Sequence, residues 1–332
     1  MKKAILVVPL VLLLLAGCGE RVKKTTTGVK PSKALQFAVL GKSIHPYWDE
    51  VKLGAEAAGK DLGVNVYFYV PPKEDVRAQI SQLESYISMK VDGISFAASD
   101  PDAVTDTIKK ALDMGIPCVA IDTDAPKSGR LAYIGTGNYE AGKIAGETMA
   151  KALNGKGKVV ILTGSLTALN SLERMKGFKD VIAKYPGIKV IDTICDYEDE
   201  SKAISSAEAA LSAHPDLSGF YGVYAFDGPA AALAVERANK VGKVKIVCFD
   251  TTPEHMEYIK KGVITATIGQ RPYMMGYLSV ALLYNIAKLG QDKALMLLPK
   301  DRKIDTGVDI VTKDNLDEYR SRLQKLGIPV KW

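Results

Sequence analysis

The side chains most able to bind a ligand gather in one short loop near the start of the chain. The segment GKSIHPYWDE (41–50) follows the apolar run LQFAVL (35–40) and contains one of the three histidines and one of the two tryptophans. Lys42 and His45 supply polar groups, whereas Tyr47 and Trp48 supply flat rings. Small-molecule pockets typically combine aromatic walls with a few polar groups that bind the ligand. Trp48 and Tyr47 have the alternative of packing in a core, and His45 that of an ordinary loop residue.

A second set of polar residues lies at or near the ends of apolar runs farther along the chain. Asp122 ends the run IPCVAID, and Asp250 ends KVKIVCFD. Carboxylates accept protons from hydroxyls, arginine donates in a fixed fork, and amides do both. The residues that supply this mixture are Asp122, Asn170, Arg174, Asp227, Asp250 and Gln270. The two aspartates at the ends of these runs have the alternative of capping turns, and Arg174 that of a surface ion pair with Asp180 or Glu173.

Short β-rich runs alternate with helical stretches in two successive series. The first series begins with strands at 35–41 and 64–70 around a helix near 48–62, and the second begins with a strand at 158–164. Strands that alternate with helices of about 10–15 residues predict parallel βαβ units. The two series are offset by roughly 125 residues, which is too long for a solenoid repeat. We therefore predict an α/β fold with two similar doubly wound parallel-sheet domains.

The offset between the two series places equivalent loops opposite each other. VAIDTD (119–124) aligns with IVCFDTT (246–252), and LGKSIHPYW (40–48) aligns with LTGSLTALN (162–170). Ligands of open parallel sheets bind outside the carboxyl ends of the strands. Two sheets that present these ends to each other would form a polar cleft with aromatic walls.

Several motifs resemble the periplasmic monosaccharide-binding proteins of ABC importers. The similarity covers residues 35–332 and rests on GVYAFDGPAAAL, KIVCFDTTPE, GVITATIGQRPYMMG and the pair IPCVAIDTDAP and YIGTGNYEAGK. The group it resembles most is that of the glucose- and xylose-binding lipoproteins of thermophilic bacteria. The resemblance implies the type I periplasmic binding protein fold, with one lobe at 35–138 plus 271–305 and the other at 139–270 plus 306–332.

The same resemblance implies how the lobes are connected. The chain is expected to cross between them three times, near Gly137–Asn138, near Gln270 and near Asp305–Gly307, so that the hinge has three segments. The fifth strand of each lobe is expected to come from the other half of the sequence. The helix that contains MMGYLSVALLYNIAKLG is expected to cover the first lobe.

The resemblance also implies a set of sugar-binding residues and no catalytic ones. The sequence departs from the ribose-binding pattern at His45, where that pattern usually has asparagine, and at Thr123, where that subgroup has arginine. These departures argue against ribose, and we favour D-glucose or D-xylose. The loop at 195–200 corresponds to a further contact region, in which no single residue is assigned. The predicted ligand-binding residues are Lys42, His45, Tyr47, Trp48, Asp122, Asn170, Arg174, Asp227, Phe249, Asp250 and Gln270, with Tyr47, Trp48 and Phe249 as the aromatic walls.

The first residues of the chain are typical of an exported lipoprotein. MKKAILVVPLVLLLLAGCGE has a basic start and an apolar run that is short for a membrane span, and its LAGC ending (15–18) resembles the bacterial lipobox. We predict a signal peptide at 1–17, lipidation of Cys18 and a polar tether over 18–34, which places the protein outside the cytoplasm on the membrane. The alternative is an ordinary secretion signal with an incidental cysteine.

These features predict a binding protein that closes on a monosaccharide and delivers it to an ABC transporter permease. A sensory alternative, presentation of the sugar to a membrane histidine kinase or chemoreceptor, has the same ligand chemistry. We expect a monomer without cofactor or metal. Cys118, Cys195 and Cys248 lie in or beside apolar runs at spacings that suit neither zinc nor a redox pair, so we interpret them as small buried hydrophobes.

Two other classes of function have less support. The formal net charge is +6, but the first thirty residues hold six of the basic residues against one acid, so the rest is close to neutral and does not favour nucleic-acid binding. Paired carboxylates in the cleft could serve glycoside hydrolysis. However, we find no serine–histidine–acid set, no phosphate-loop lysine and no complete dinucleotide loop. Binding without chemistry is the simpler interpretation.

Overall fold

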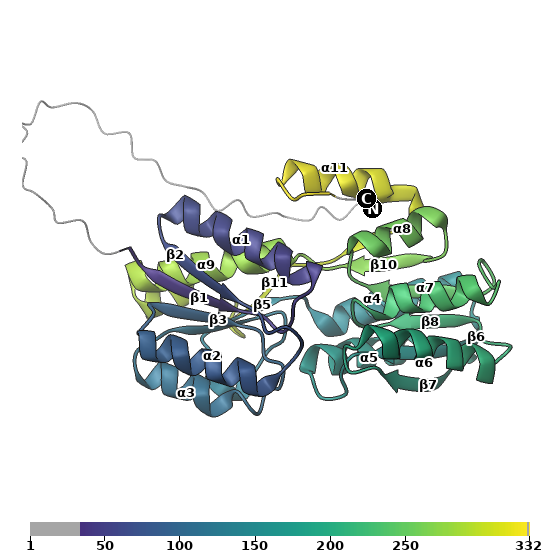
Figure 1. The fold of residues 1–332 in the computed structure, drawn as a ribbon, viewed down its shortest axis with the longest axis horizontal. Coiled ribbons are helices and arrows are strands. Elements are labelled where there is room, and N and C mark those ends of the chain that lie inside the picture. The colour runs from purple at the N-terminus through teal and green to yellow at the C-terminus, as the bar shows by residue number, and fades with distance from the viewer. Residues whose placement is uncertain (1–33, 331) are drawn as a thin grey trace, which may run out of the picture. The chain divides into compact units, whose positions relative to one another are not determined.

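The computed structural model describes residues 34–330 and 332. Residues 1–33, with the predicted signal peptide and Cys18, lie outside the described residues. The described part of the chain forms two six-stranded sheets, and helices cover both faces of each sheet (Figure 1). Of these twelve strands, eleven pair in parallel, in an order in which non-consecutive strands are neighbours, and β12 is antiparallel to β10. The prediction of two doubly wound α/β domains is therefore confirmed.

The first sheet is parallel throughout. Its strands, in spatial order, are β11 (Lys303–Asp305), β5 (Tyr133–Gly135), β4 (Cys118–Ile121), β3 (Gly93–Phe96), β1 (Gln36–Leu40) and β2 (Asn65–Tyr69). The helices of this lobe are α1 (Pro46–Leu62), α2 (Val76–Met89), α3 (Thr105–Asp113), α9 (Pro272–Leu289) and α10 (Gln291–Met296).

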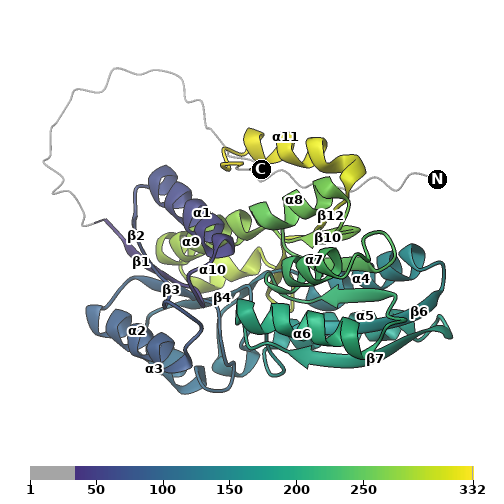
Figure 2. The same cartoon turned by 45° about the vertical axis from the view of Figure 1, so that its right-hand side comes forward.

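Alternation along β1 explains why helices cover both faces of this sheet. Phe37 and Val39 belong to the core formed with α1 and α9, whereas Ala38 and Leu40 belong to the core formed with α2 and α3. Successive side chains of a strand point to opposite faces, so an uninterrupted apolar run such as FAVL requires a covering layer on each side. Figure 2, turned by 45° from Figure 1, shows α1 with α9 and α2 with α3 as the two layers.

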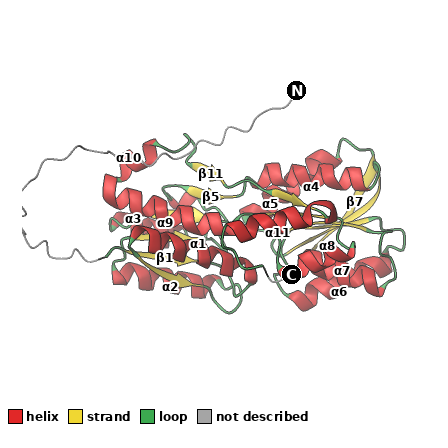
Figure 3. Cartoon of the chain, turned by 90° about the horizontal axis from the view of Figure 1, so that it is seen from above, coloured by secondary structure: helices red, strands yellow, loops and turns green. Residues whose placement is uncertain are grey.

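The second sheet repeats this order, with one antiparallel edge strand, β12, paired with β10. Its strands, in spatial order, are β12 (Asp309–Val311), β10 (Ala266–Gly269), β9 (Lys245–Phe249), β8 (Gly219–Gly222), β6 (Lys156–Thr163) and β7 (Gly187–Cys195). The helices of this lobe are α4 (Asn138–Ala152), α5 (Leu169–Ile182), α6 (Glu200–Ala213), α7 (Asp227–Arg237), α8 (Pro253–Lys261) and α11 (Leu316–Lys325). In Figure 3, α4 and α5 lie on one side and α6 and α7 on the other, which matches the two cores of this lobe.

The chain passes between the sheets at residues 136–137, 270–271 and 306–308. These positions agree with the three expected crossings, and α9 packs against α1 of the first lobe as expected. The expected exchange of the fifth strand is wrong. The fifth strands β5 and β10 belong to their own series, and it is the sixth strand β11 that joins the first sheet from the second half of the sequence. Strands of three residues give too little periodicity to be assigned from sequence.

Local sequence signals explain where α1 begins and ends. His45 is the N-cap, its Nδ1 accepts a hydrogen bond from the Tyr47 amide at 3.2 Å, and Pro46 occupies the first turn. Gly63 ends the helix in the left-handed conformation at φ 66°, which glycine adopts without strain. This cap fixes where the predicted aromatic loop enters the helix. Among the described residues, no helix combines the length and apolar character needed to span a membrane.

Candidate functional site

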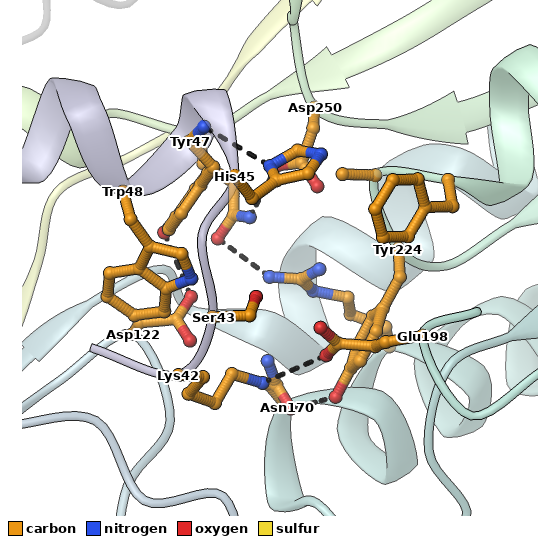
Figure 4. Close-up of a pocket in the computed structure, with 14 residues that line it drawn as sticks. Lys42, Ser43, His45, Tyr47, Trp48, Asp122, Asn170, Glu198, Tyr224 and Asp250 are labelled. Carbon is orange, nitrogen blue, oxygen red and sulfur yellow. Dashed lines mark hydrogen bonds and ion pairs between the residues drawn. The ribbon is translucent and has the colours of Figure 1, made fainter. Parts of the chain in front are cut away.

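A cavity lies between the carboxyl ends of the strands of the two sheets. It contains about 420 Å³ of space not filled by protein atoms, including the part that is open to solvent. The β1–α1 loop and the residue after β4 contribute from the first lobe, and loops after β6, β7, β8 and β9 contribute from the second. The lining residues are Lys42, Ser43, His45, Tyr47, Trp48, Asp122, Asn170, Arg174, Glu198, Tyr224, Ala225, Phe226, Asp250 and Gln270 (Figure 4).

The first lobe contributes an aromatic wall that is tied to Asp122. The Tyr47 hydroxyl donates to Asp122 Oδ1 at 2.9 Å, and the Tyr47 and Trp48 rings meet edge to face at 5.2 Å between centroids. Trp48 is 4% exposed and also belongs to the core of this lobe, so both interpretations of this residue hold. Because the cap bond leaves the proton of a neutral imidazole on Nε2, His45 offers one N–H donor from the same loop.

Arg174 is the centre of a buried network in the second lobe. Its Nη1 donates to the Val223 carbonyl at 3.0 Å and its Nη2 donates to Gln270 Oε1 at 2.6 Å. The Gln270 amide in turn donates to Asp250 Oδ1 at 2.7 Å. The guanidinium lies 4.2 Å above the centre of the Phe249 ring, which supports it from below. This network fixes the arginine fork and the Asp250 carboxylate before any ligand arrives.

The other end of the cavity holds a polar cluster with residues from both lobes. Lys42 of the first lobe is 3.3 Å from Glu198 Oε1 of the second lobe and 3.7 Å from Glu74 Oε1 of its own lobe. The Lys42 ammonium also lies 5.0 Å from the centre of the Tyr224 ring. The Tyr224 hydroxyl donates to Asn170 Oδ1 at 2.8 Å, which leaves the amide nitrogen of Asn170 for other acceptors. Figure 4 shows Lys42, Glu198, Asn170 and Tyr224 together at this end.

Burial changes the protonation of several lining residues. Burial, opposed by Arg174, raises the pKa of Asp250 from 3.8 to about 6. Burial raises the pKa of Glu198 from 4.5 to about 8, although Lys42 opposes this change. Burial lowers the pKa of His45 from 6.5 to about 4, so its imidazole is neutral at physiological pH. For Arg174, the lowering effect of burial on its pKa is outweighed by Asp250 and Asp122. The cavity is thus a desolvated environment in which hydrogen bonds are strong.

Several polar atoms that line the cavity have no protein partner in the described part of the chain. They comprise donors and acceptors from both lobes, namely Ser43 Oγ, Trp48 Nε1, Asn170 Nδ2 and Asp250 Oδ2. Because the bonds to Asn138, Val223 and Gln270 use three of the five N–H groups of Arg174, two remain. A ligand with hydroxyls on several sides would satisfy these groups. Within residues 34–330 and 332, no cluster of three or more histidine, cysteine or acidic side chains is suited to a metal ion.

Most of the predicted ligand-binding residues are brought together in the cavity, but two are not. The Phe249 ring lies beneath Arg174 and is fully buried in the core, so its expected place in an aromatic wall is wrong. Asp227 is fully buried and does not line the cavity, and its Oδ2 accepts from the Val223 and Tyr224 amides at 2.8 Å each. Phe226, one position earlier, lines the cavity instead. For Phe249, the last residue of β9, the difference comes from the register at the strand end, where one residue reverses the direction of a side chain. Asp227 is instead the first residue of α7, and its carboxylate binds the backbone that precedes the helix.

Sequence reasoning did not assign Glu198 and Tyr224, although both line the cavity. Glu198 comes from the 195–200 loop, which was expected to contribute an unspecified contact. Tyr197 and Glu198 both have positive φ, 62° and 54°, and no pattern in the loop sequence predicts which side chain turns inward. Tyr224 follows a buried strand and looks like a core residue. Its hydroxyl, which needs a partner when buried, was the only signal that it serves a polar site.

Comparison with known proteins agrees with this geometry. Residues 37–292 match the family described as periplasmic binding protein domain. The chain belongs to this family. The two-lobed fold and the cavity between the strand ends are therefore to be compared with those of other periplasmic binding proteins.

Relatives of this periplasmic binding protein bind several different sugars. A solute-binding protein from Burkholderia graminis, solved with D-arabinose, is 39% identical with a TM-score of 0.82 and covers 88% of this chain and 99% of its own. GanP, a glucose-galactose binding protein from Geobacillus stearothermophilus, is 34% identical with a TM-score of 0.79, over 86% of this chain and 99% of its own. The D-allose-binding periplasmic protein of Escherichia coli is 27% identical over 82% of this chain and 91% of its own.

Proposed function

We propose that this periplasmic binding protein captures a monosaccharide between its lobes and delivers it to an ABC transporter permease. The observation that carries this proposal is the composition of the cavity. Carboxylates, a guanidinium, carboxamides and aromatic rings from both lobes line a single site between the strand ends. We favour D-glucose or D-xylose from the sequence, and the relatives add D-arabinose and galactose as candidates.

The chemistry of the cavity suits a neutral ligand with many hydroxyls. Both cations of the lining, Lys42 and Arg174, already contact acidic or amide side chains. An anionic ligand would therefore have to compete for cations that already have protein partners. A pyranose instead presents hydroxyls around its edge, which suit Asp122, Asp250 and Asn170, and C–H faces, which suit Trp48.

Capture is proposed to occur by closure of the hinge. The described structure already has contacts across the cleft, because Lys42 meets Glu198 and the His45 ring meets the Phe226 ring edge to face at 4.9 Å. A sugar that contacts both lobes has more partners in the closed form than in the open form. It therefore shifts the population toward closure in proportion to that difference in affinity. The lobes are taken as 35–138 plus 271–305 and 139–270 plus 306–332.

The proposed place of action is the outer face of the membrane, with Cys18 as the lipidated residue. This part of the proposal rests on the sequence of residues 1–33. Replacement of Cys18 by serine should leave sugar affinity unchanged and release the protein from the membrane fraction. Retention of the serine variant in that fraction would contradict the anchor while leaving the sugar site untouched.

Calorimetry of residues 34–332 with a sugar panel tests the function directly. The panel includes D-glucose, D-xylose, D-arabinose, D-galactose and D-ribose, with mannitol as an open-chain control. We expect saturable binding of at least one pyranose and none of mannitol. Small-angle scattering with the bound sugar should show a smaller radius of gyration than without it. The absence of binding across the panel, or binding of the open-chain control alone, would contradict the proposal.

A further inference from the structure

Two buried acids do not line the cavity themselves but bind the backbone of residues that do. Asp196 follows β7 and is 1% exposed, and Asp227 begins α7 and is 0% exposed. Each carboxyl group affects the pKa of the other as a hydrogen-bond partner, which places the two groups side by side. Asp196 Oδ2 and Asp227 Oδ1 meet no N–H or O–H donor of the described residues. Two neighbouring carboxyl oxygens form a hydrogen bond only when a proton lies between them, so one shared proton would satisfy both unpaired oxygens.

The remaining oxygens of the pair bind the backbone of two cavity-lining residues. Asp196 Oδ1 accepts from the Glu198 amide at 2.8 Å. Asp227 Oδ2 accepts from the Tyr224 amide at 2.8 Å and from the Val223 amide at 2.8 Å. The carbonyl of Val223 in turn receives Arg174 Nη1. The pair therefore connects the loop after β7 with the turn after β8, and both segments supply the sugar site.

The surroundings of the pair favour the singly protonated form. No lysine or arginine of the described residues forms a salt bridge with either acid. The titratable groups that face the pair are Asp199 at the start of α6, Tyr221 on β8, Cys248 on β9 and Glu198, none of which supplies a positive charge. Burial raises the pKa of Asp227 well above its ordinary value and also raises the pKa of Asp196. Two adjacent buried carboxylates cannot both ionise without strong repulsion.

We propose that Asp196 and Asp227 are positioning residues whose shared proton holds Glu198 and Tyr224 in place for the sugar. This inference rests on the proposed function, because it assigns a role within the same site. Neither acid lines the cavity, so each acts through the backbone that it holds. The pair also explains why the chain keeps an acid, instead of an apolar residue, at two fully enclosed positions.

Asparagine substitutions test the pair, because each acid uses one carboxyl oxygen for the backbone and the other for its partner acid. In Asp196→Asn or Asp227→Asn, the amide oxygen can keep the backbone bond and the amide N–H can donate to the remaining carboxylate. We expect each single variant to retain sugar affinity within about threefold. In the double variant, the two N–H₂ groups face each other and one amide must turn away from its backbone partner. We expect an affinity about tenfold or more below that of either single variant, a non-additive effect.

Alanine variants and a cycle with Glu198 separate positioning from simple loss of stability. Asp196→Ala should weaken binding where Asp196→Asn does not. Asp196 acts through Glu198, so the two substitutions should not be additive. Glu198→Gln should reduce affinity much less in the Asp196→Ala background than in the wild-type background. The proposal is overturned if the double asparagine variant binds like the single variants. It is also overturned if each asparagine variant weakens binding as much as alanine does.

The wild-type measurement distinguishes failure of this inference from failure of the proposed function. If wild type binds none of D-glucose, D-xylose and D-arabinose, the sugar function fails. The melting temperatures of the single and double asparagine variants then still test the shared proton. If the decrease in melting temperature of the double variant is no larger than the sum of the two single decreases, the shared proton is overturned. A decrease clearly larger than that sum would support the shared proton.

Discussion

Asp122 and Asp250 end equivalent strands of the two sheets with the same unusual backbone. Asp122 follows β4 with φ 57°, and Asp250 follows β9 with φ 76°. β4 and β9 hold the same place in the two strand orders, and both carboxyl groups line the cavity. A left-handed conformation is uncommon outside glycine, and asparagine and aspartate tolerate it best. The duplicated fold thus supplies two similar hydroxyl acceptors, one from each lobe.

Loss of the Asp250 carboxylate should weaken sugar binding strongly. We expect Asp250→Ala to reduce affinity at least about tenfold, or about 1.4 kcal/mol, because it removes a charged acceptor from a desolvated site. Asp100→Ala is the matched control, since Asp100 also follows a strand of a sheet but caps its own turn outside the cavity lining. Calorimetry measures both variants. Wild-type affinity in Asp250→Ala, or an equal loss in the control, would refute the assignment.

Sugar affinity should increase with pH across the range in which Asp250 ionises. Burial raises the pKa of Asp250 to about 6, so the carboxyl is largely neutral at pH 5 and largely ionised at pH 7. Because the ionised form is the stronger acceptor, affinity should rise between these values. Asp250→Asn should bind more weakly and lose most of this rise. A parallel pH dependence in wild type and Asp250→Asn would assign the effect to another group.

The stability of the free protein should respond to the same group in the opposite direction. The pKa of Asp250 is 3.8 ordinarily and about 6 in the folded protein, so the folded state binds the proton more tightly. Its contribution to the free energy of unfolding is therefore fully present below pH 3.8 and is lost as pH rises through about 6. The difference between wild type and Asp250→Asn in urea denaturation at pH 4 and pH 7 isolates this contribution. If the free energy of unfolding of wild type increased with pH relative to that of Asp250→Asn, the predicted direction of the effect would be wrong.

The positions of the site residues were largely predictable because strand ends are predictable. Apolar runs mark the strands, and parallel strands place their carboxyl ends on one edge, so Asp122, Arg174 and Asp250 could be assigned to one cleft before the structure was known. Which side of that edge a residue faces was not predictable. Asp227 and Phe249 each lie one position from a lining residue, Phe226 or Asp250. A single step at the end of β9 decides between core and cavity for Phe249, whereas for Asp227 the start of α7 decides it.

The contribution of Glu198 could not be predicted because it depends on tertiary contacts. Its loop has no periodicity, and the inward turn of Glu198 is held by the buried acid Asp196 and by Lys42 from the other lobe. Asp196 is two residues before Glu198, but Lys42 is 156 residues away, and no sequence pattern shows that Glu198 meets it. The sixth strand β11, three residues long, was missed for a similar reason, since its place is set by pairing with β5 and not by its own sequence.

Removal of Glu74 should slow sugar release. Glu74 lies 3.7 Å from Lys42 in the same lobe and is not part of the cavity lining, whereas Glu198 meets Lys42 from the opposite lobe. Glu74 also contributes to the raised pKa of Glu198, whose value of about 8 leaves it mostly neutral at pH 7. In Glu74→Gln, Lys42 has one acidic partner and Glu198 ionises more readily, so the pair across the cleft should strengthen.

Stopped-flow measurement of dissociation tests this effect of Glu74. We expect the dissociation rate to fall about threefold, because the change strengthens one existing ion pair across the cleft and adds no new contact. Glu84→Gln is the control, because it removes the same charge from an exposed position on α2 of the same lobe. Faster release from Glu74→Gln than from the control would mean that Glu74 supports the closed form instead of competing with it.

The contact between α4 and α5 should matter for affinity as well as for stability. At Gly142, an added Cβ would lie 2.2 Å from the Arg174 carbonyl oxygen, so Gly142→Ala must push α5 away at the residue that carries the guanidinium. At Gly146, one turn later on α4, the added Cβ would lie 2.9 Å from Val181 Cβ, farther from the site. Overpacking of this kind costs about 1–3 kcal/mol of folding free energy.

We therefore expect both alanine variants to unfold at lower urea concentration, and only Gly142→Ala to lose about tenfold or more in sugar affinity, because the Arg174 fork is useful only in a fixed geometry. Calorimetry on the folded fraction and urea denaturation of each variant separate the two effects. Equal affinity losses in Gly142→Ala and Gly146→Ala would mean that affinity is lost through destabilisation of the whole lobe and not through displacement of Arg174. Unchanged affinity in Gly142→Ala despite lower stability would mean that the network with Asn138, Val223 and Gln270 holds Arg174 independently of its own helix.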